Sequence, residues 1–183
     1  MNYLDQYIIQ FSGLDNDKEY SYNFIVGDAF FLNFEKSDIK GGNLDISVDL
    51  LKKSRSLTLN ISLKGYANIV CDRCLDIYIQ DINFKDSILV MFADETNFDT
   101  NEDYITLDHN LNEINISQFI YEFANFALPF VHYHPLDKNK LPTCNPEMLK
   151  LIEKHSSIEQ EGNTIDIRWE KLIDLKNNYI NNS

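Results

Sequence analysis

Two cysteines separated by two residues constrain the fold of this chain more than any other feature. Cys71 and Cys74 form a C-x-x-C pair, which places two thiols on one side of a tight turn, close enough to hold one metal ion. The remaining cysteine, Cys144, lies ten positions beyond His134. Three sulfurs and one imidazole nitrogen complete a shell of four ligands, so the sequence predicts that residues 134–144 fold back onto this turn.

A closed shell of four protein ligands is typical of structural zinc, because catalytic zinc keeps one position open. Two other interpretations stay open: buried thiols without a metal, and a redox pair. A redox pair of the thioredoxin type begins a helix, whereas the residues on both sides of this pair alternate as strands do. His132 competes with His134 as the fourth ligand, while His109 and His155 are expected in solvent.

Alternating apolar and polar residues predict antiparallel strands around the cysteine pair. The alternation is clearest over 44–50 and 57–63, and the polar turn Lys52-Lys53-Ser54-Arg55 between them predicts a hairpin. Glycines predict breaks in the chain at Lys40-Gly41-Gly42-Asn43 and at Lys64-Gly65. Further strands are expected at 22–26, 66–71, 75–82, 87–92 and 104–107, with 87–92 buried on both sides and the C-x-x-C pair at or next to a hairpin tip.

Helical spacing replaces this alternation after residue 114. Asn115 and Gln118 predict a capping box for a helix that ends at Leu128-Pro129. A second helix is expected to begin at Asn145-Pro146, with Asn as the N-cap and Pro in the first turn. A third is expected over 166–177, after a polar linker at 156–163.

These elements predict an α+β fold, a curved or barrel-like antiparallel β-sheet with C-terminal helices packed on it. A length of 183 residues fits a single domain, or one domain with a helical tail. Within it, residues 1–40 supply N-terminal strands or a wrapping segment, residues 41–108 form the β-rich core with the C-x-x-C hairpin, and residues 114–178 form the helical part.

The chain carries a formal net charge of −13, with a pI of about 4.6. Such a charge repels nucleic acid at long range and favours basic partners, or it serves only to prevent aggregation. Residues 94–113 include seven acidic residues and no Lys or Arg, which predicts a solvated loop or a binding surface for a basic partner. The candidate contacts to RNA or to a protein partner are four basic residues near turns, Lys52, Lys53, Arg55 and Arg73. Tyr66 or Tyr78 could offer stacking faces nearby. The alternative is that these basic residues are ordinary solvated turn residues without a partner.

Catalytic and targeting motifs are absent from the sequence. We find no G-x-S-x-G, Walker A, G-x-G-x-x-G or H-E-x-x-H motif, so no catalytic residue and no small-molecule substrate are predicted. No secretory signal and no apolar run long enough to span a membrane occurs, and three cysteines cannot form a complete disulfide framework. We therefore expect a cytoplasmic protein with reduced thiols.

In the order of its motifs, the chain resembles the YceD-like family, the large ribosomal RNA subunit accumulation proteins. The segment from Gly65 to Leu75 reads G-x-x-x-x-x-C-x-R-C-L, and a helix with Glu122 ends in Leu-Pro. His134-Pro135 then precedes Cys144-Asn145, and the tail from Asp166 reads D-x-R-W-x-x-L-x-x-L. The resemblance covers about residues 40–176; the spacer 136–143 is longer, and the tail less basic, than the family pattern.

This resemblance implies a non-enzymatic ribosome biogenesis factor that supports large-subunit rRNA accumulation or processing, in bacterial cytoplasm or in plastids. It would act by binding large-subunit ribosomal RNA or a basic ribosomal protein. Cys71, Cys74, His134 and Cys144 match the Cys/His pattern of the family, in which the sequence predicts structural zinc. The alternatives are a thiol-redox or metal-dependent enzyme that uses this cluster, and a pure protein-interaction module.

Overall fold

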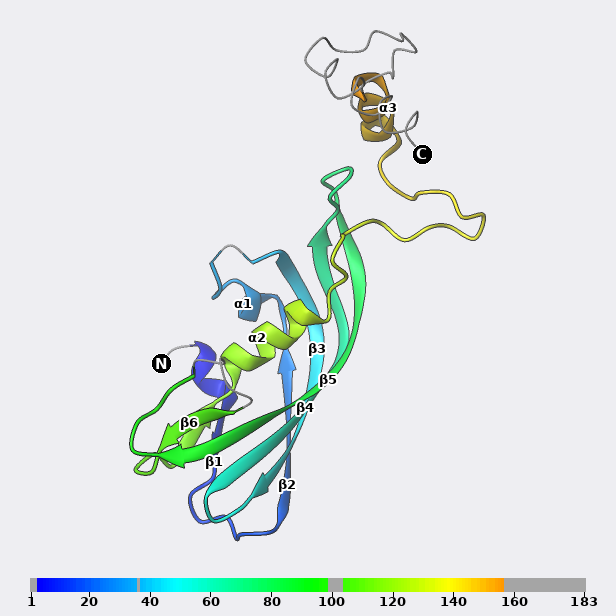
Figure 1. The fold of residues 1–183 in the computed structure, drawn as a ribbon. Coiled ribbons are helices and arrows are strands. Elements are labelled where there is room, and N and C mark those ends of the chain that lie inside the picture. Colours follow the sequence, from blue (N-terminus) through cyan, green and yellow to red (C-terminus); the bar gives the residue numbers. More distant parts are fainter. Residues whose placement is uncertain (1–2, 36, 99–103, 157–183) are drawn as a thin grey trace, which may run out of the picture. The chain divides into compact units, whose positions relative to one another are not determined.

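A computed structural model describes residues 3–35, 37–98 and 104–156. The chain divides into two compact units, Met1–Pro146 and Glu147–Ser183, which we describe separately. The first unit contains a five-stranded sheet in the order β2-β3-β4-β5-β6 (Figure 1). Its strands are β2 (Glu19–Val26), β3 (Ile39–Lys52), β4 (Ser56–Val70), β5 (Ile77–Ala93) and β6 (Ile105–Asp108).

The predicted α+β class is confirmed, but the barrel-like form is wrong. The outer strands of the sheet, β2 and β6, do not pair with each other, so the sheet stays open. Neighbouring strands are antiparallel except β5 and β6, which are parallel. Closing a barrel requires the two outer strands to pair with each other, and β2 and β6 do not.

The N-terminal segment contributes to two sheets. After the 3-10 helix η1 (Tyr3–Tyr7), strand β1 (Ile8–Gln10) pairs with β7 (Glu113–Asn115) in a separate two-stranded sheet. Strand β2 then forms one outer strand of the large sheet, and the short helix α1 (Asp28–Phe31) leads into β3. The described residues before Gly41 therefore contribute strands to the fold rather than only wrapping around it.

One face of the large sheet forms the hydrophobic core. Leu59, Ile61 and Leu63 of β4 are buried, while Asn60 is exposed on the opposite face. The helix α2 (Ser117–Phe126) covers the apolar face, where the rings of Phe123 and Phe84 lie 5.5 Å apart (Figure 1). Burying each such large side chain contributes roughly 1.5–3 kcal/mol, so this packing holds the sheet and helix together.

The predicted breaks at glycines lie inside strands instead. Gly41 and Gly42 belong to β3, with a register shift between Ile39 and Gly41, and Gly65 belongs to β4. Gly42 and Gly65 have φ of +148° and +146°, and a Cβ at either position would collide with backbone atoms of the opposite strand. These glycines therefore permit close approach of β3 and β4 rather than ending either strand.

The two strands predicted at 75–82 and 87–92 form one long strand, β5. The polar residues between them remain in the ladder with β4 because their face of the sheet is open to solvent. For the same reason the expectation that 87–92 is buried on both sides is wrong: Ser87 and Leu89 are exposed, whereas Val90 is buried.

The first two predicted helices are present, with one difference in capping. α2 begins after Asn115. The Asn115 Oδ1 accepts a hydrogen bond from the Ser117 N–H at 2.9 Å, and the Gln118 side chain donates to the Glu122 carboxylate at 2.8 Å. The capping box is therefore wrong, because its two side chains bond elsewhere.

The second helix, α3 (Pro146–His155), has no buried residue in the described part of the second unit. The predicted third helix and nearly all of the linker before it lie outside the described residues. Within the part of the chain that the structure describes, no helix is long and apolar enough to cross a membrane.

Candidate metal centre

The C-x-x-C pair occupies the turn that joins β4 to β5, as its position in the sequence predicts. The Cys71 N–H donates to the Asp76 carbonyl, and the Leu75 N–H donates to the Cys71 carbonyl, each at 2.9 Å. Leu75 takes a left-handed conformation, with φ of +64°. This tight turn places the thiols of Cys71 and Cys74 on the same side, because the chain reverses between them.

Residues after α2 return to this turn and pair with it. The Asp72 N–H donates to the His132 carbonyl and the His132 N–H donates to an Asp72 carboxylate oxygen, both at 2.7 Å. Farther along, the Asn145 side chain donates to the Asp76 carboxylate at 3.1 Å. These bonds fix His134 and Cys144 beside the two cysteines of the turn.

The long spacer between His134 and Cys144 folds into a small loop of its own. Leu136 and Pro142 form an isolated β-bridge, and the Asp137 N–H donates to the Leu141 carbonyl at 2.8 Å. At its base the Thr143 hydroxyl donates to the Pro135 carbonyl at 2.6 Å. Because this loop closes on itself, its extra length does not separate the two candidate ligands.

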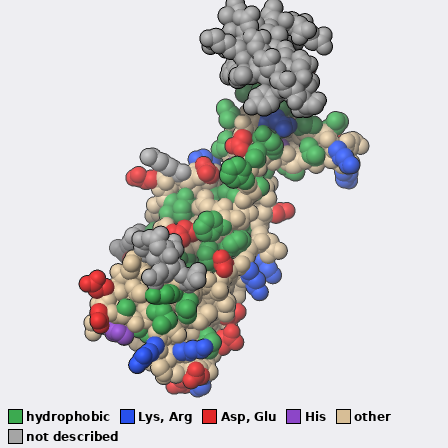
Figure 2. All heavy atoms as spheres, in the orientation of Figure 1, with side chains coloured by type: hydrophobic (Ala, Val, Ile, Leu, Met, Phe, Trp, Pro, Cys, Tyr) green, Lys and Arg blue, Asp and Glu red, His purple; other side chains and the backbone are tan. Residues whose placement is uncertain are grey.

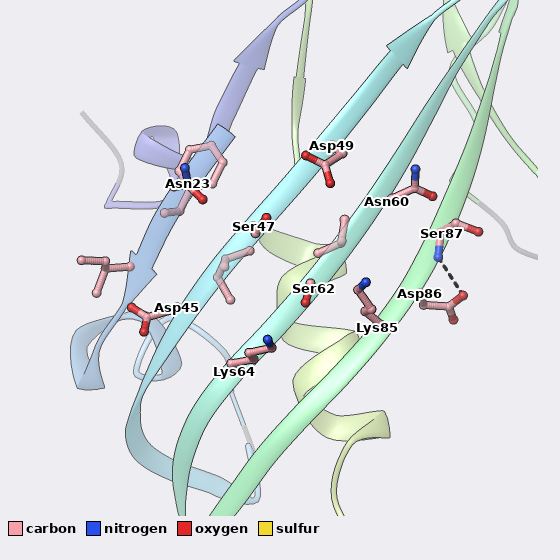
Figure 3. Close-up of a pocket in the computed structure, with 14 residues that line it drawn as sticks. Asn23, Asp45, Ser47, Asp49, Asn60, Ser62, Lys64, Lys85, Asp86 and Ser87 are labelled. Carbon is pink, nitrogen blue, oxygen red and sulfur yellow. Dashed lines mark hydrogen bonds between the residues drawn. The ribbon is translucent and has the colours of Figure 1, made fainter. Parts of the chain in front are cut away.

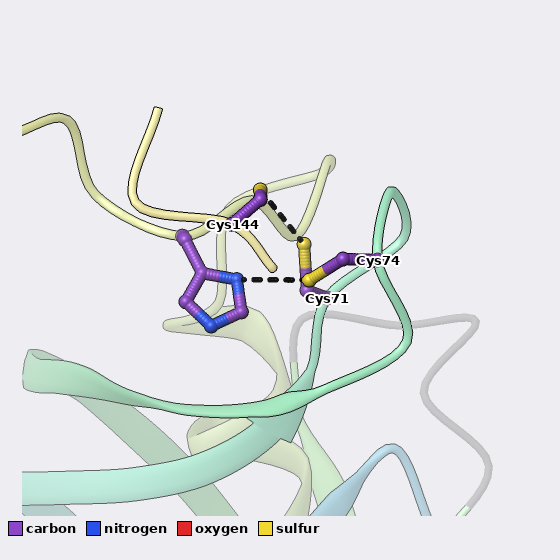
Figure 4. Close-up of side chains that lie close together, drawn as sticks. Cys71, Cys74 and Cys144 are labelled. Carbon is purple, nitrogen blue, oxygen red and sulfur yellow. Dashed lines mark hydrogen bonds between the residues drawn. The ribbon is translucent and has the colours of Figure 1, made fainter. Parts of the chain in front are cut away.

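The four predicted ligands converge on one point (Figure 4). The sulfur atoms of Cys71, Cys74 and Cys144 and a ring nitrogen of His134 all lie within 4.8 Å of one another. The Sγ atoms of Cys71 and Cys144 are 3.8 Å apart, and the Cys74 Sγ lies 3.4 Å from His134 Nδ1. All three cysteines are buried, and the imidazole is half-buried.

These distances fit a tetrahedral zinc ion better than they fit a disulfide. With Zn–S bonds of about 2.3 Å and Zn–N bonds of about 2.0–2.1 Å, two sulfurs of a tetrahedron lie about 3.8 Å apart and a sulfur and nitrogen about 3.5 Å apart. A disulfide requires about 2.05 Å between sulfurs, and the three cysteines are free. Three thiols and one imidazole are also the donor set that zinc prefers. The residues present therefore fit the predicted metal.

The environment of Cys71 favours its thiolate. Burial raises the pKa of this thiol. Hydrogen bonds from the Cys74 backbone, the His134 side chain and the backbones of Arg73 and His134 lower the pKa, and together they outweigh burial, so the pKa falls to about 6. The pKa of Cys144 is raised instead, by burial and by its contacts with Cys71 and Cys74. Two neighbouring thiols thus resist simultaneous ionisation unless a cation offsets their charge.

Tyr78 forms one wall of this cluster. Its ring lies 5.0 Å from the His134 ring, and its hydroxyl is buried without a hydrogen-bond partner. Burial raises the pKa of Tyr78, and negative charge on Cys71 and Asp72 raises it further. Because Tyr78 is only 6% exposed, it offers no stacking face to a nucleic acid base, whereas Tyr66 is exposed.

The predicted basic contacts lie in two separate places. Lys52, Lys53 and Arg55 lie at the β3–β4 turn, where the Lys52 ammonium donates to the Phe11 and Leu14 carbonyls at 3.0 and 2.9 Å. Arg73 lies beyond the other end of β4, with its guanidinium 4.4 Å from the centre of the Tyr133 ring. Figure 2 shows basic side chains on this face of the molecule interspersed with acidic ones, not gathered into one patch.

The open face of the sheet contains a hollow that was not predicted from the sequence (Figure 3). It has a volume of about 870 Å³. Its polar lining comes from β2, β3, β4 and β5: Asn23, Asp45, Ser47, Asp49, Asn60, Ser62, Lys64, Lys85, Asp86 and Ser87. The polar positions of the alternating strands are the signal for this surface, since they mark the face that the core leaves open.

Comparison with known proteins adds one finding. A family model described as "Large ribosomal RNA subunit accumulation protein YceD" matches residues 59–176, more than half of the 183 residues. The matched region contains all four candidate ligands, Cys71, Cys74, His134 and Cys144. No curated protein and no solved structure matches the chain.

Proposed function

Because the chain belongs to the family of large ribosomal RNA subunit accumulation proteins, YceD, we propose that it is a non-enzymatic factor of large-subunit biogenesis. It supports accumulation or processing of large-subunit rRNA by binding either this RNA or a basic ribosomal protein. The observation that carries the proposal is the family match, which spans the C-x-x-C turn, α2 and the returning segment with His134 and Cys144.

The zinc ion in this proposal is structural. Cys71, Cys74, His134 and Cys144 would hold it, and four protein ligands leave no open position for water or substrate. The ion supplies a cross-link between the β4–β5 turn and residues 132–144. Its role is therefore to fix the shape of this end of the molecule, where Arg73 and Tyr133 are presented together.

The charge of the chain favours a protein partner over direct RNA contact. A formal net charge of −13 attracts basic ribosomal proteins and repels a phosphate backbone at distances up to the Debye length, about 8–10 Å in physiological salt. The candidate RNA contacts do not reverse this balance, because Lys52, Lys53 and Arg55 are separated from Arg73 by the length of β4. We therefore favour a basic ribosomal protein as the direct partner.

Gradient sedimentation tests the biogenesis role. Cell extract is sedimented through sucrose at low and high salt, and the protein is detected by blotting. We expect co-migration with large-subunit precursors at low salt and release at high salt, because the contact is electrostatic. RNase treatment of the low-salt fraction separates the two partners: a ribosomal protein still co-purifies after digestion, whereas a direct rRNA contact is lost. A protein that stays at the top of both gradients contradicts the proposal.

A thiol-redox enzyme is the second candidate, favoured by the pKa of about 6 at Cys71. In a redox enzyme the thiolate must reach a substrate disulfide, whereas Cys71 is fully buried beneath the segment with His134 and Cys144. Thiol titration of the native protein separates these roles. A structural site protects all three thiols until a chelator is added, while a redox enzyme shows one fast-reacting thiol without a chelator.

A further inference from the structure

One side of the β5 backbone has no neighbouring strand among the described residues before Val90. Hydrogen bonds flank the β4–β5 ladder at both ends: the Cys71 N–H donates to the Asp76 carbonyl, and the Phe92 N–H donates to the Arg55 carbonyl. The antiparallel register runs without a shift between them. Because the direction of backbone groups alternates along a strand, even-numbered residues of β5 face β4, and the N–H and C=O groups of odd-numbered residues point away from it.

Strand β6 covers only the last part of this edge. It pairs with β5 from Val90 onward, and none of the described residues pairs with the edge before that. Two side chains reach the uncovered part: Gln80 donates to the Asp81 carbonyl at 3.1 Å, and the Asp86 carboxylate accepts from the Ser87 N–H at 2.7 Å. Within the described part of the chain, the outward backbone groups of Ile77, Ile79, Asn83 and Lys85 have no partner.

The opposite edge of the sheet is less open. There the Tyr7 hydroxyl donates to the Ile25 carbonyl at 3.3 Å, and the Tyr22 hydroxyl donates to the Gln10 carbonyl at 3.4 Å. The N-terminal segment thus lies near β2. By contrast, the side chains of the odd-numbered residues Ile77 to Ser87 are all exposed (Figure 1 shows β5 as the outer strand here).

The chemistry of the β5 edge is apolar at one end and acidic beyond it. Ile77 and Ile79 are 59% and 63% exposed, on a strand edge where proteins that avoid pairing place charges or proline. Asp81 and Asp86 follow, with Lys85 as the one basic side chain between Ile77 and Ser87. Exposed isoleucines next to free backbone groups indicate a surface that pairs with another chain.

We propose that this edge, from Ile77 to Lys85, binds an extended basic segment of a partner protein as an additional β-strand. The proposal rests on the biogenesis role above and specifies how the basic ribosomal protein would be recognised. Backbone hydrogen bonds supply affinity in such strand addition, and alternate side chains supply specificity. Apolar residues of the segment contact Ile77 and Ile79, and its basic residues face Asp81 and Asp86. A second copy of the chain is disfavoured because each carries a net charge of −13.

Two substitutions at Asn83 test the backbone contact. Asn83→Pro removes the outward N–H without removing a ladder bond to β4, and proline is tolerated at strand edges. Asn83→Ala is the matched control, because it removes the same side chain and keeps the N–H. The probe is a capped peptide of about nine residues, the length of this edge, with valine opposite Ile77 and Ile79 and lysine opposite Asp81, because these three odd-numbered residues share one face of β5. We expect roughly tenfold weaker binding by Asn83→Pro and little change in Asn83→Ala; equal affinities of the two variants overturn the proposal.

Amide hydrogen exchange of the full-length wild-type protein gives a readout that does not depend on a variant's folding. Addition of the peptide should protect the amides of Ile77, Ile79, Asn83 and Lys85, and a peptide N-methylated at alternate amides should not protect them. Protection without peptide together with a dimeric mass in sedimentation equilibrium would instead assign the edge to a second copy. Protection by an rRNA fragment and not by the peptide would assign it to RNA, and either result overturns the proposal.

Sucrose gradients distinguish failure of this proposal from failure of the biogenesis role. If both Asn83 variants co-migrate with large-subunit precursors as the wild type does, the biogenesis role stands and the strand-addition proposal is overturned. If only Asn83→Pro leaves the precursors, the result supports both. If the wild type itself stays at the top of the gradient, the biogenesis role fails, and the strand-addition proposal fails with it as a contact to a ribosomal protein.

Discussion

The body of the large sheet and the C-x-x-C end of the same sheet are held together by different interactions. In the body, apolar side chains of β3 and β4 such as Leu50 and Leu59 are fully buried, with α2 over the apolar face of β4 and β5. At the C-x-x-C end, Ile79 is 63% exposed and Phe130 is fully exposed. Buried there are the three cysteines and Tyr78, together with Ile69, which pairs with Tyr78 across the β4–β5 ladder.

This difference indicates how each region is stabilised. Apolar burial contributes about 25 cal/mol per Å² of buried apolar surface and needs no added ligand. A turn with few buried apolar side chains requires a cross-link to hold a distant segment, because ordering each residue costs about 1–2 kcal/mol in backbone entropy. We therefore expect the body to fold without metal and the C-x-x-C end to depend on it.

The largest expected effect is on metal affinity. His134→Ala removes one of four ligands and should weaken Zn²⁺ binding by at least about 100-fold, since a structural site contributes roughly 10–16 kcal/mol in total. Competition with a chromogenic chelator measures the affinity, and Co²⁺ absorption reports tetrahedral coordination. Chelation should also speed amide exchange near Cys71 and leave exchange in β3 unchanged.

His132→Ala is the control for this prediction. His132 pairs with Asp72 through its backbone, and its side chain is not part of the cluster. Its substitution should therefore leave the metal affinity within about threefold of wild type. An equal loss of metal affinity in His132→Ala and His134→Ala would contradict the assignment of His134 as the one imidazole ligand.

The next effect is on the body of the sheet. Leu59→Ala leaves a cavity under the sheet and should lower the free energy of unfolding by about 2–5 kcal/mol, measured by urea denaturation. The neighbouring Asn60→Ala, on the open face, should change it by no more than about 0.5 kcal/mol. Metal affinity should be unchanged in both; a loss of metal in Leu59→Ala would show that the two regions are not separate.

A smaller effect is expected where β3 and β4 approach each other closely. Gly65→Ala places a methyl group against the Asn43 backbone at a φ that side chains avoid, and should cost roughly 1–3 kcal/mol. Gly13→Ala separates the two causes, because Gly13 has φ of +77° but nothing within 4 Å of an added Cβ. Its cost should be about 1 kcal/mol, from backbone conformation alone. Thermal denaturation compares them, and an equal cost would rule out the backbone collision.

The last prediction concerns the pH dependence of the metal-free protein. The pKa of Cys71 is lowered from 9.0 to about 6, so its ionised form is stabilised by folding. Stability from this group is therefore fully present above its ordinary pKa of 9.0 and is lost as the pH falls through about 6. Ultraviolet absorbance of the thiolate should show a titration near pH 6 that Cys71→Ser lacks. Titration of every thiol at or above its ordinary pKa would contradict this expectation.

Local patterns were most reliable where a single physical rule applies. The alternation over 44–50 and 57–63 predicted paired strands correctly, because one face of each strand must be buried. The helix predicted from the spacing of apolar residues between Phe119 and Ala127 and the start of a helix at Pro146 were also confirmed. The strand break predicted at Gly65 was wrong. A glycine can either end a strand or permit the close approach of two backbones, and only the position of the neighbouring strand distinguishes these roles.

The sequence by itself determined the α+β class and the four residues of the candidate metal centre, because periodicity and ligand chemistry are local properties. Tertiary structure decided that the sheet stays open, that residues 136–142 fold into a loop joining His134 to Cys144, and that Arg55 and Arg73 lie at opposite ends of β4. It also decided which part of β5 has no neighbouring strand among the described residues. Each of these depends on which segments pair across long sequence separations, and that pairing is set by the packing of the whole chain rather than by any one segment.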